Sequence, residues 1–355
     1  IYVVLVSQAA HTLAVHPGWR GTAEFAAVFG LVWIAWMNGT LYHELHGRED
    51  GRSRFYVFAQ MAVLAVLAVF TAYAGTVDGT AFALTYTVLL LLLTWQWYEV
   101  RRRDLPENKP ASTPYLLGLA VTTVVMVASA WLPDVPRLVA WLAITIGWVA
   151  LGLVAFVGLA RPLQYFEATE SLVERMALFV IIVLGETVVG VVNGIGETDR
   201  DALTMATGML GLCIGFGIFW NYFDVVGARE PRRDARSLAA WFFGHLPQTG
   251  SIAVAGAAMV GLVAEAHEPR TSAAVAWTLS GAVAVILLLI AVQSSAVEQH
   301  HALEARTRTA VYVVGAVLVL VVAAFTPAPC LLALLVVGVL SLTWLSAFVP
   351  SPERA

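Results

Sequence analysis

The chain has 355 residues, of which 59% are hydrophobic and only 12% are charged, whereas soluble domains average roughly 45–50% and 25%. Its mean hydropathy is +0.79, and apolar runs recur along its length, which excludes a soluble enzyme and a disordered chain. The formal net charge of −4 at pH 7 provides no basic field for nucleic acid. The composition therefore predicts an all-α polytopic membrane protein.

Apolar segments follow one another along the whole chain, and most have the roughly 20 residues that a helix needs to cross a bilayer. We expect about 12 transmembrane helices, at residues 1–16, 22–46, 54–75, 79–100, 113–132, 137–159, 174–194, 202–226, 237–263, 273–297, 310–326 and 329–349. The first segment is short and opens on Ile1, so we expect part of its helix to lie upstream. It lacks the basic start and the cleavage site of a signal peptide.

The basic residues are distributed unevenly between the two sets of loops. Loops after odd-numbered segments hold only Arg20, Arg137, Arg200 and Arg270. Every other basic residue lies in a loop after an even-numbered segment or in the C-terminal tail. The positive-inside rule therefore predicts that both termini are cytoplasmic.

Short sequence matches recur in the same order in the two halves of the chain. Residues 4–8 and 34–36 match residues 182–186 and 218–220, and Gln96 and Tyr115 match Gln293 and Tyr312 at one common offset. We predict a first six-helix repeat at residues 1–160, an interfacial linker at 161–173 and a second repeat at 174–355. Six helices per repeat make the two repeats parallel. The alternative is a chance likeness between apolar helices.

Glu186 is the clearest polar residue inside an apolar span. A charge at bilayer depth costs about 2.5–3.5 kcal/mol, so its side chain should face the bundle interior. Glu186 lies about 18 Å along a helix from Glu174, near the middle of the hydrocarbon core. We interpret it as a proton-carrying or ligand-contacting acid, the alternative being a buried structural acid. Gly185 and Gly190 would let another backbone approach this face.

Other polar side chains could share a cavity with Glu186. His245 lies beside Pro247, about 12 Å along its helix from Ser237, and the combination of a kink with a titratable ring suggests a ligand or proton site. A hydrogen-bonded core histidine is the alternative. Asn221 and Gln60 lie within other spans and are further candidates.

The residues around the start of the seventh span suggest a cavity mouth rather than a metal site. Arg175 shares a helix face with Glu186, about 16 Å away, and would lie with Glu174 at the cytoplasmic mouth, unless it is simply an interfacial arginine. Glu167, Glu170 and Glu174 follow helical spacing, and a solvated face explains them better than hard-metal ligation. Without a cysteine or nucleotide motif, we expect no metal and no cofactor.

The segment Leu172 to Glu186, LVERMALFVIIVLGE, resembles the signature of the bacterial low-temperature-requirement A family, roughly ER, two residues, LF, an apolar run and LGE. Residues 243–247 and the stretch from Trp36 to Gln60 and Met61 are also similar to that family. The resemblance implies a multi-pass protein of the inner membrane, and it implies no settled activity. Members often carry a histidine where this chain has Ser171, which further disfavours a metal, and commonly begin with an acidic, Phe-rich segment absent here.

The leading hypothesis is a secondary transporter with two six-helix halves around a central cavity. Glu186 would be its protonatable acid, with His245, Asn221 and Gln60 lining the cavity. A membrane-embedded enzyme acting on a lipid or apolar substrate, with Glu186 and His245 as acid and base, is one alternative. A structural or sensory protein is the other. The expected partners are the lipid bilayer and an unidentified small-molecule or lipid ligand, in an undefined oligomeric state.

Overall fold

The computed structural model of the chain describes residues 1–15, 18–46, 51–76, 78–103, 109–155, 168–298 and 305–346. These residues are all-α and contain no strand beyond an isolated bridge between Pro231 and Val297. The linker predicted at 161–173 lies largely outside the described residues, as does Glu167.

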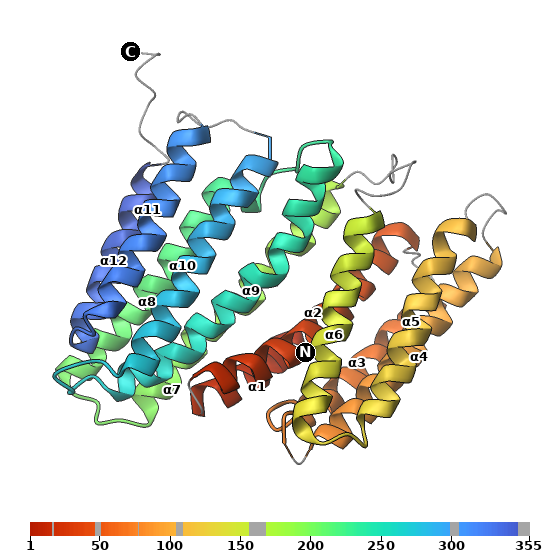
Figure 1. Cartoon of the computed structure of the whole chain (residues 1–355), viewed down its shortest axis with the longest axis horizontal. Coiled ribbons are helices and arrows are strands. Elements are labelled where there is room, and N and C mark those ends of the chain that lie inside the picture. Colours follow the sequence, from red (N-terminus) through yellow and green to blue (C-terminus); the bar gives the residue numbers. More distant parts are fainter. Residues whose placement is uncertain are drawn as a thin grey trace. The chain divides into compact units, whose positions relative to one another are not determined.

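The described residues form twelve α-helices, shown in Figure 1. The first six are α1 (Tyr2–Val15), α2 (Trp19–His46), α3 (Gly51–Thr71), α4 (Gly79–Arg103), α5 (Lys109–Ser129) and α6 (Asp134–Leu153). The second six are α7 (Glu170–Gly196), α8 (Ala202–Tyr222), α9 (Ala235–Ala264), α10 (Ala273–Ala296), α11 (Ala305–Ala324) and α12 (Pro329–Ser346). A short π-helix, η2 (Phe223–Gly227), continues α8 directly.

Four helices of the second half begin at a residue whose side chain caps the first turn. The side chain of Thr169 accepts the backbone N–H of Leu172 at the start of α7. The caps of the next three helices are Asp201 for α8, Asp234 for α9 and Ser272 for α10. Because the first N–H groups of a helix have no partner inside it, these short polar side chains fix where each helix starts.

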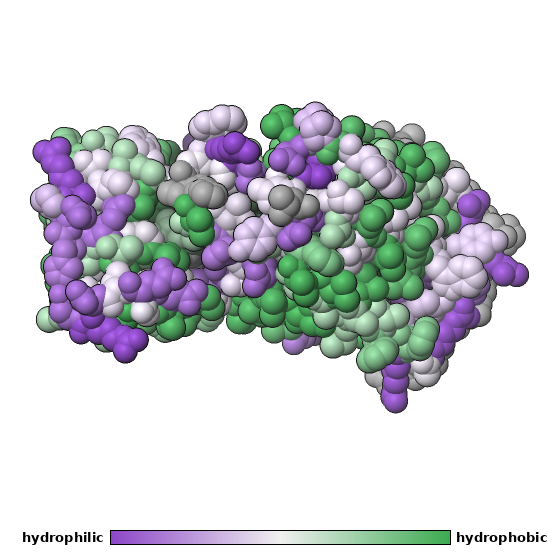
Figure 2. Space-filling view, turned by 90° about the horizontal axis from the view of Figure 1, so that it is seen from below, coloured by the Kyte–Doolittle hydropathy of each residue, from purple (hydrophilic) through white to green (hydrophobic). Residues whose placement is uncertain are grey.

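Ten of the described helices are long and apolar enough to cross a membrane, and α1 and residues 115–129 of α5 form shorter apolar helices. Large apolar side chains remain on the surface, such as Val69 at 70% and Leu342 at 66% exposure. Figure 2 shows broad apolar areas between patches of hydrophilic residues. An exposed apolar surface of this extent is suited to lipid rather than water.

The chain divides into two compact units. Unit 1 comprises Ile1–Thr12 and Ala23–Gly152, and unit 2 comprises Leu13–Thr22 and Leu153–Ala355. Within unit 1, α4 packs against both α3 and α5. The Tyr86 hydroxyl of α4 donates to the Leu31 carbonyl of α2 at 2.9 Å, which ties α2 into the same unit.

Within unit 2, α9 packs against both α7 and α10, and α10 packs against α11. Helix α12 packs against α11 and α8. Helix α9 is continuous through Pro247. Each predicted segment therefore corresponds to one helix of the structure within a few residues, and the candidate residues can be located on this framework.

Candidate functional site

Glu186 lies inside unit 2, on the face of α7 that meets α9. It follows the first residue of α7 by about 24 Å and precedes the last by about 15 Å, and its side chain is buried. A Cβ atom placed on Gly256 of α9 would lie 2.9 Å from the Glu186 Cγ atom, and one placed on Gly190 would collide with the Gly256 carbonyl oxygen. The close approach expected at Gly190 is confirmed. The one expected at Gly185 is wrong, because a Cβ there meets nothing within 4 Å.

His245 lies at the meeting point of α8, α9 and α10. Its Nδ1 atom is 2.6 Å from the Trp241 carbonyl oxygen, and its Nε2 atom is 2.8 Å from the Tyr222 hydroxyl. A carbonyl oxygen only accepts, so Nδ1 carries the proton and Nε2 accepts from Tyr222. The Gln293 amide also donates to the Trp241 carbonyl, at 3.4 Å. The neutral Nδ1–H tautomer is thus the form that these contacts define.

The His245 cluster lies close to one end of the helices that surround it. Gln293 precedes the last residue of α10 by about 5 Å, and Tyr222 is the last residue of α8. Counting along α9 from Ser237 gives a position about 12 Å deep, but α9 is the longest helix of the described chain, with 30 residues. Its first turns therefore extend past the level at which α10 ends.

The structure does not bring Glu186 and His245 together. Gly256, against which Glu186 packs, follows His245 by 11 residues of α9, or about 16 Å. General acid–base partners must lie within hydrogen-bond or one-water reach of their substrate. The acid–base pair of the enzyme hypothesis is therefore not formed.

Gln248 lies on α9 between the levels of His245 and Gly256. Its side chain is 0% exposed, and neither its amide nitrogen nor its amide oxygen has a hydrogen-bond partner in the described part of the chain. Buried polar atoms are almost always paired, so an unpaired amide at this position needs a physical explanation. The sequence analysis missed this residue, although its place directly after His245-Leu246-Pro247 is a usable signal.

Asn221 uses its polar atoms to join α8 to α12. Its amide nitrogen donates to the Gly217 carbonyl at 2.8 Å and to the Leu340 carbonyl at 2.9 Å. Its amide oxygen accepts from the Thr343 hydroxyl at 3.0 Å. The side chain is fully buried, and these three bonds occupy it with helix–helix contacts.

The other candidates are more peripheral or belong to the other unit. Gln60 is a half-buried residue of unit 1 that donates to the Gln96 amide oxygen at 2.5 Å. Near the start of α7, Glu174 is exposed and Arg175 is half-buried, with its Nε atom 3.3 Å from the Ser171 hydroxyl. No group of three or more metal-ligating side chains occurs among the described residues.

A groove of about 510 Å³ runs along the surface between α4 and α5 of unit 1. Its lining includes Leu91, Trp95, Tyr98, Arg101 and Leu117. None of the candidate residues lines this groove. Its aromatic side chains are of the kind that membrane proteins place at the bilayer interface.

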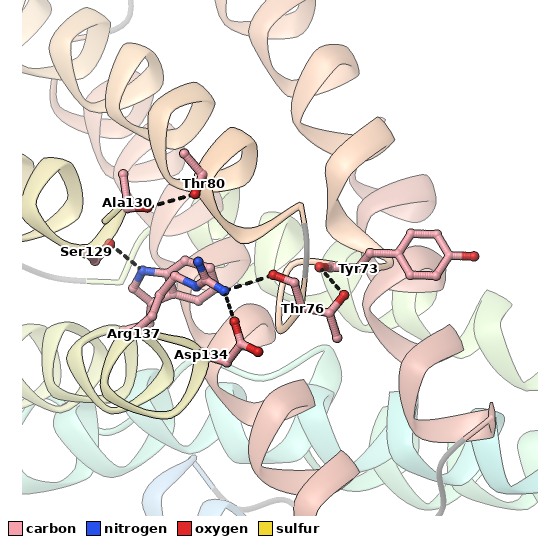
Figure 3. A network of polar contacts seen from close by, with 8 residues as sticks. Tyr73, Thr76, Thr80, Ser129, Ala130, Asp134 and Arg137 are labelled. Carbon is pink, nitrogen blue, oxygen red and sulfur yellow. Dashed lines mark hydrogen bonds and ion pairs between the residues drawn. The ribbon is translucent and has the colours of Figure 1, made fainter. Parts of the chain in front are cut away.

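Unit 1 also contains a buried arginine, shown in Figure 3. The Arg137 guanidinium donates to the Thr76 carbonyl at 2.9 Å, forms an ion pair with Asp134 and lies over the Trp141 ring. The Trp141 indole in turn donates to the Ser129 hydroxyl at 2.9 Å. Every one of these contacts lies within unit 1, so the arginine holds together the turns that join its helices.

These features define a class of protein: a multi-pass α-helical membrane protein with polar side chains buried inside its second helical unit. Residues 1–346 match the family model described as bacterial low temperature requirement A protein (LtrA). The chain therefore belongs to this bacterial family. No curated protein and no solved structure matches it.

Proposed function

We propose that the protein is a proton-coupled secondary transporter of the bacterial inner membrane, with both termini in the cytoplasm. The observation that carries this proposal is the buried and unpaired amide of Gln248. It lies on α9 between the level of His245 and that of Gly256, against which Glu186 packs. A polar group left unpaired at this depth is expensive in an apolar bundle unless a water or a solute visits it.

Buried polar groups then follow α9 from mid-membrane toward one end. Glu186 lies against Gly256, Gln248 lies about 12 Å before Gly256, and His245 lies about 5 Å before Gln248. Gln293 adds an amide oxygen that has no partner among the described residues. We infer that this row of buried polar side chains is the route of the transported proton and solute. Glu186 is the acid that carries the proton.

The remaining candidates would support this route rather than carry the proton. Asn221 would hold α8 against α12 beside it. Glu174 and Arg175, at the start of α7, would contact solutes at the cytoplasmic mouth. Gln60 would line the equivalent route of unit 1.

The two halves of the chain, residues 1–160 and 174–355, are proposed to be parallel repeats of each other. In unit 1, Gln60 of α3 donates to Gln96 of α4. In unit 2, His245 of α9 and Gln293 of α10 meet at the Trp241 carbonyl. Side-chain pairing between the third and fourth helix of each unit supports the repeat, because sequence offset already matches Gln96 with Gln293.

The proposal is tested by reconstituting the full chain in liposomes that contain a pH-sensitive dye. A panel of amino acids, sugars, organic anions and organic cations is imposed as gradients, and solute-dependent proton movement is recorded. We expect at least one solute class to move protons with the wild type and Glu186→Gln to abolish this movement. Glu197→Gln, at the exposed end of the same helix, should keep it.

A second variant separates transport from packing. Gln248→Leu removes both unpaired amide atoms at nearly constant volume, so we expect a protein at least as stable as the wild type and markedly slower in transport. Wild-type movement in both Glu186→Gln and Gln248→Leu would contradict the route. A wild type that moves no proton with any solute class would contradict transport itself and favour a sensing role.

Orientation is tested separately by cysteine labelling after Cys213 and Cys330 are replaced. Single cysteines at the exposed positions 199 and 233 are treated with an impermeant maleimide in intact cells and in inverted membranes. We expect position 199 to react only from outside and position 233 only from inside. The reverse pattern would overturn the proposed topology.

A further inference from the structure

Arg308 is a buried arginine near the start of α11. Its side chain is 1% exposed, and its Nη2 atom donates to the Ser294 carbonyl of α10 at 3.1 Å. Its Nε and Nη1 atoms have no hydrogen-bond partner in the part of the chain that the structure describes. Arginine is always charged, so two of its donor nitrogens are buried without compensation.

Tyr312 lies one turn after Arg308 on the same face of α11. Its side chain is 0% exposed, and its hydroxyl also has no partner among the described residues. The two side chains interact electrostatically. The unpaired donors of the Arg308 guanidinium and the Tyr312 hydroxyl therefore lie on the same buried face of α11.

The loop between η2 and α9 brings further positive charge to this place. Arg308 interacts electrostatically with Arg229 and Arg232. The loop is fixed beside the end of α10, because the Arg232 N–H donates to the Ala296 carbonyl at 2.8 Å and Pro231 bridges Val297. These backbone contacts fix the loop that carries Arg229 and Arg232 beside the end of α10, where the Ser294 carbonyl accepts from Arg308.

Nearby carboxylates balance part of the charge of Arg229 and Arg232. No ion pair in the described ranges involves Arg229, Arg232 or Arg308. Arg232 interacts electrostatically with Asp234. Burial lowers the pKa of Arg229, and the nearby carboxylate of Asp224 opposes this effect. One of the Asp224 oxygens accepts the Trp344 indole N–H at 2.6 Å.

We propose that Arg308 and Tyr312, with Arg229 and Arg232, bind a phosphate-type oxyanion at this end of unit 2. The planar guanidinium fork matches two phosphate oxygens, and a hydroxyl can donate to a third. Phosphate chemistry is available from free phosphate and from the headgroup of an anionic phospholipid, which basic pockets between transmembrane helices bind on the cytoplasmic side. This site does not depend on the proposed transport role of Glu186.

The experiment measures the melting temperature of the full chain in nanodiscs. In the first arm, inorganic phosphate is titrated into nanodiscs of phosphatidylcholine. In the second arm, phosphate is left out and phosphatidylglycerol replaces part of the lipid. A ligand that binds only the folded state raises the melting temperature in a saturable way, so a response in either arm supports the site and identifies the source of the phosphate.

Variants connect the response to this site. Tyr312→Phe keeps the ring and removes one donor to an anion, so we expect about a tenfold weaker response to the ligand. Arg308→Lys keeps the charge and removes the fork, and should abolish the response. Arg236→Gln, an exposed basic residue near the start of α9, should respond as the wild type does.

Two results would overturn the proposal. One is a melting temperature that is unchanged by phosphate and by phosphatidylglycerol. The other is an equal response in the wild type, Tyr312→Phe and Arg236→Gln, which would indicate unspecific charge screening. If Arg308→Lys does not fold, the melting-temperature response of Tyr312→Phe is the test of the site. Glu186→Gln should keep the phosphate response, so failure of the transport proposal is distinguishable from failure of this one.

Discussion

The Glu186 side chain packs directly on Gly256, and a methyl group at residue 256 would come within 2.9 Å of the Glu186 Cγ atom and 2.8 Å of its carbonyl carbon. Helices α7 and α9 can lie this close only because residue 256 has no side chain. The close approach of α9 to α7 at Glu186 is therefore permitted by a glycine on the neighbouring helix.

We expect Gly256→Ala to destabilise the protein by about 1–3 kcal/mol, because the new methyl group meets backbone atoms of α7 that cannot move independently. The measurement is the melting temperature in detergent. Gly185→Ala is the matched control, since a Cβ there meets nothing within 4 Å and alanine favours a helix. Equal melting temperatures for the two variants would contradict the close packing at Gly256.

We expect Tyr222→Phe to lower the stability by about 1 kcal/mol, because it leaves the Nε2 atom of His245 without its donor. Nitrogen NMR of labelled histidine should show His245 as the Nδ1–H tautomer in the wild type, with the Nε2 resonance shifted in the variant. A protonated Nε2 atom in the wild type would contradict the assignment made from the Trp241 carbonyl.

The carboxylate of Asp201 gives a prediction about pH. Hydrogen bonds from Thr204, first of all from its backbone N–H, and the contact with His267 hold the pKa of Asp201 below its ordinary value of 3.8. A carboxyl group with a lowered folded-state pKa stabilises the protein above its unfolded-state pKa and loses this effect as the pH falls through the folded-state value.

We therefore expect Asp201→Asn to melt below the wild type at neutral pH, and the two to converge as the pH falls below about 3.8. Asp199→Asn, an exposed change in the same loop, should follow the wild type at every pH. A constant difference between Asp201→Asn and the wild type across this range would show that ionisation is not responsible.

We expect Arg137→Met to destabilise the protein by about 2 kcal/mol, because the charged hydrogen bonds to Asp134 and to the Thr76 carbonyl are lost. The check is the denaturation midpoint in a mixed detergent and denaturant titration. Arg200→Met removes an exposed arginine and should change the midpoint little. A larger effect of Arg200→Met than of Arg137→Met would refute the role of the network in Figure 3.

The helices could be predicted from the sequence because the bilayer imposes their length and polarity. The spans expected at residues 202–226 and 237–263 correspond to α8 with η2 and to α9. The π-helix at Phe223–Gly227 was not foreseen, since hydropathy carries no information about a change from four-residue to five-residue hydrogen bonding.

Individual buried polar side chains could be predicted from the sequence, but their arrangement could not. Glu186 and His245 stand out because polar groups are costly inside apolar segments. The separation of Glu186 on α7 from His245 on α9 could not be predicted from the sequence, because it depends on which glycine of α9 faces Glu186. The sequence indicated Gln293 only as a match to Gln96. Its contact with His245 could not be predicted, because the two residues lie on different helices.

The bonds of Asn221 to α12 have a consequence for the order in which the protein is made. Its amide enters the membrane with α8, yet Leu340 and Thr343, which satisfy it, are synthesised about 120 residues later. Until α12 has left the ribosome, this buried amide lacks its interhelical partners. Unit 2 is therefore completed only after α12 has been inserted, and chains truncated before α12 should be substrates for membrane quality control.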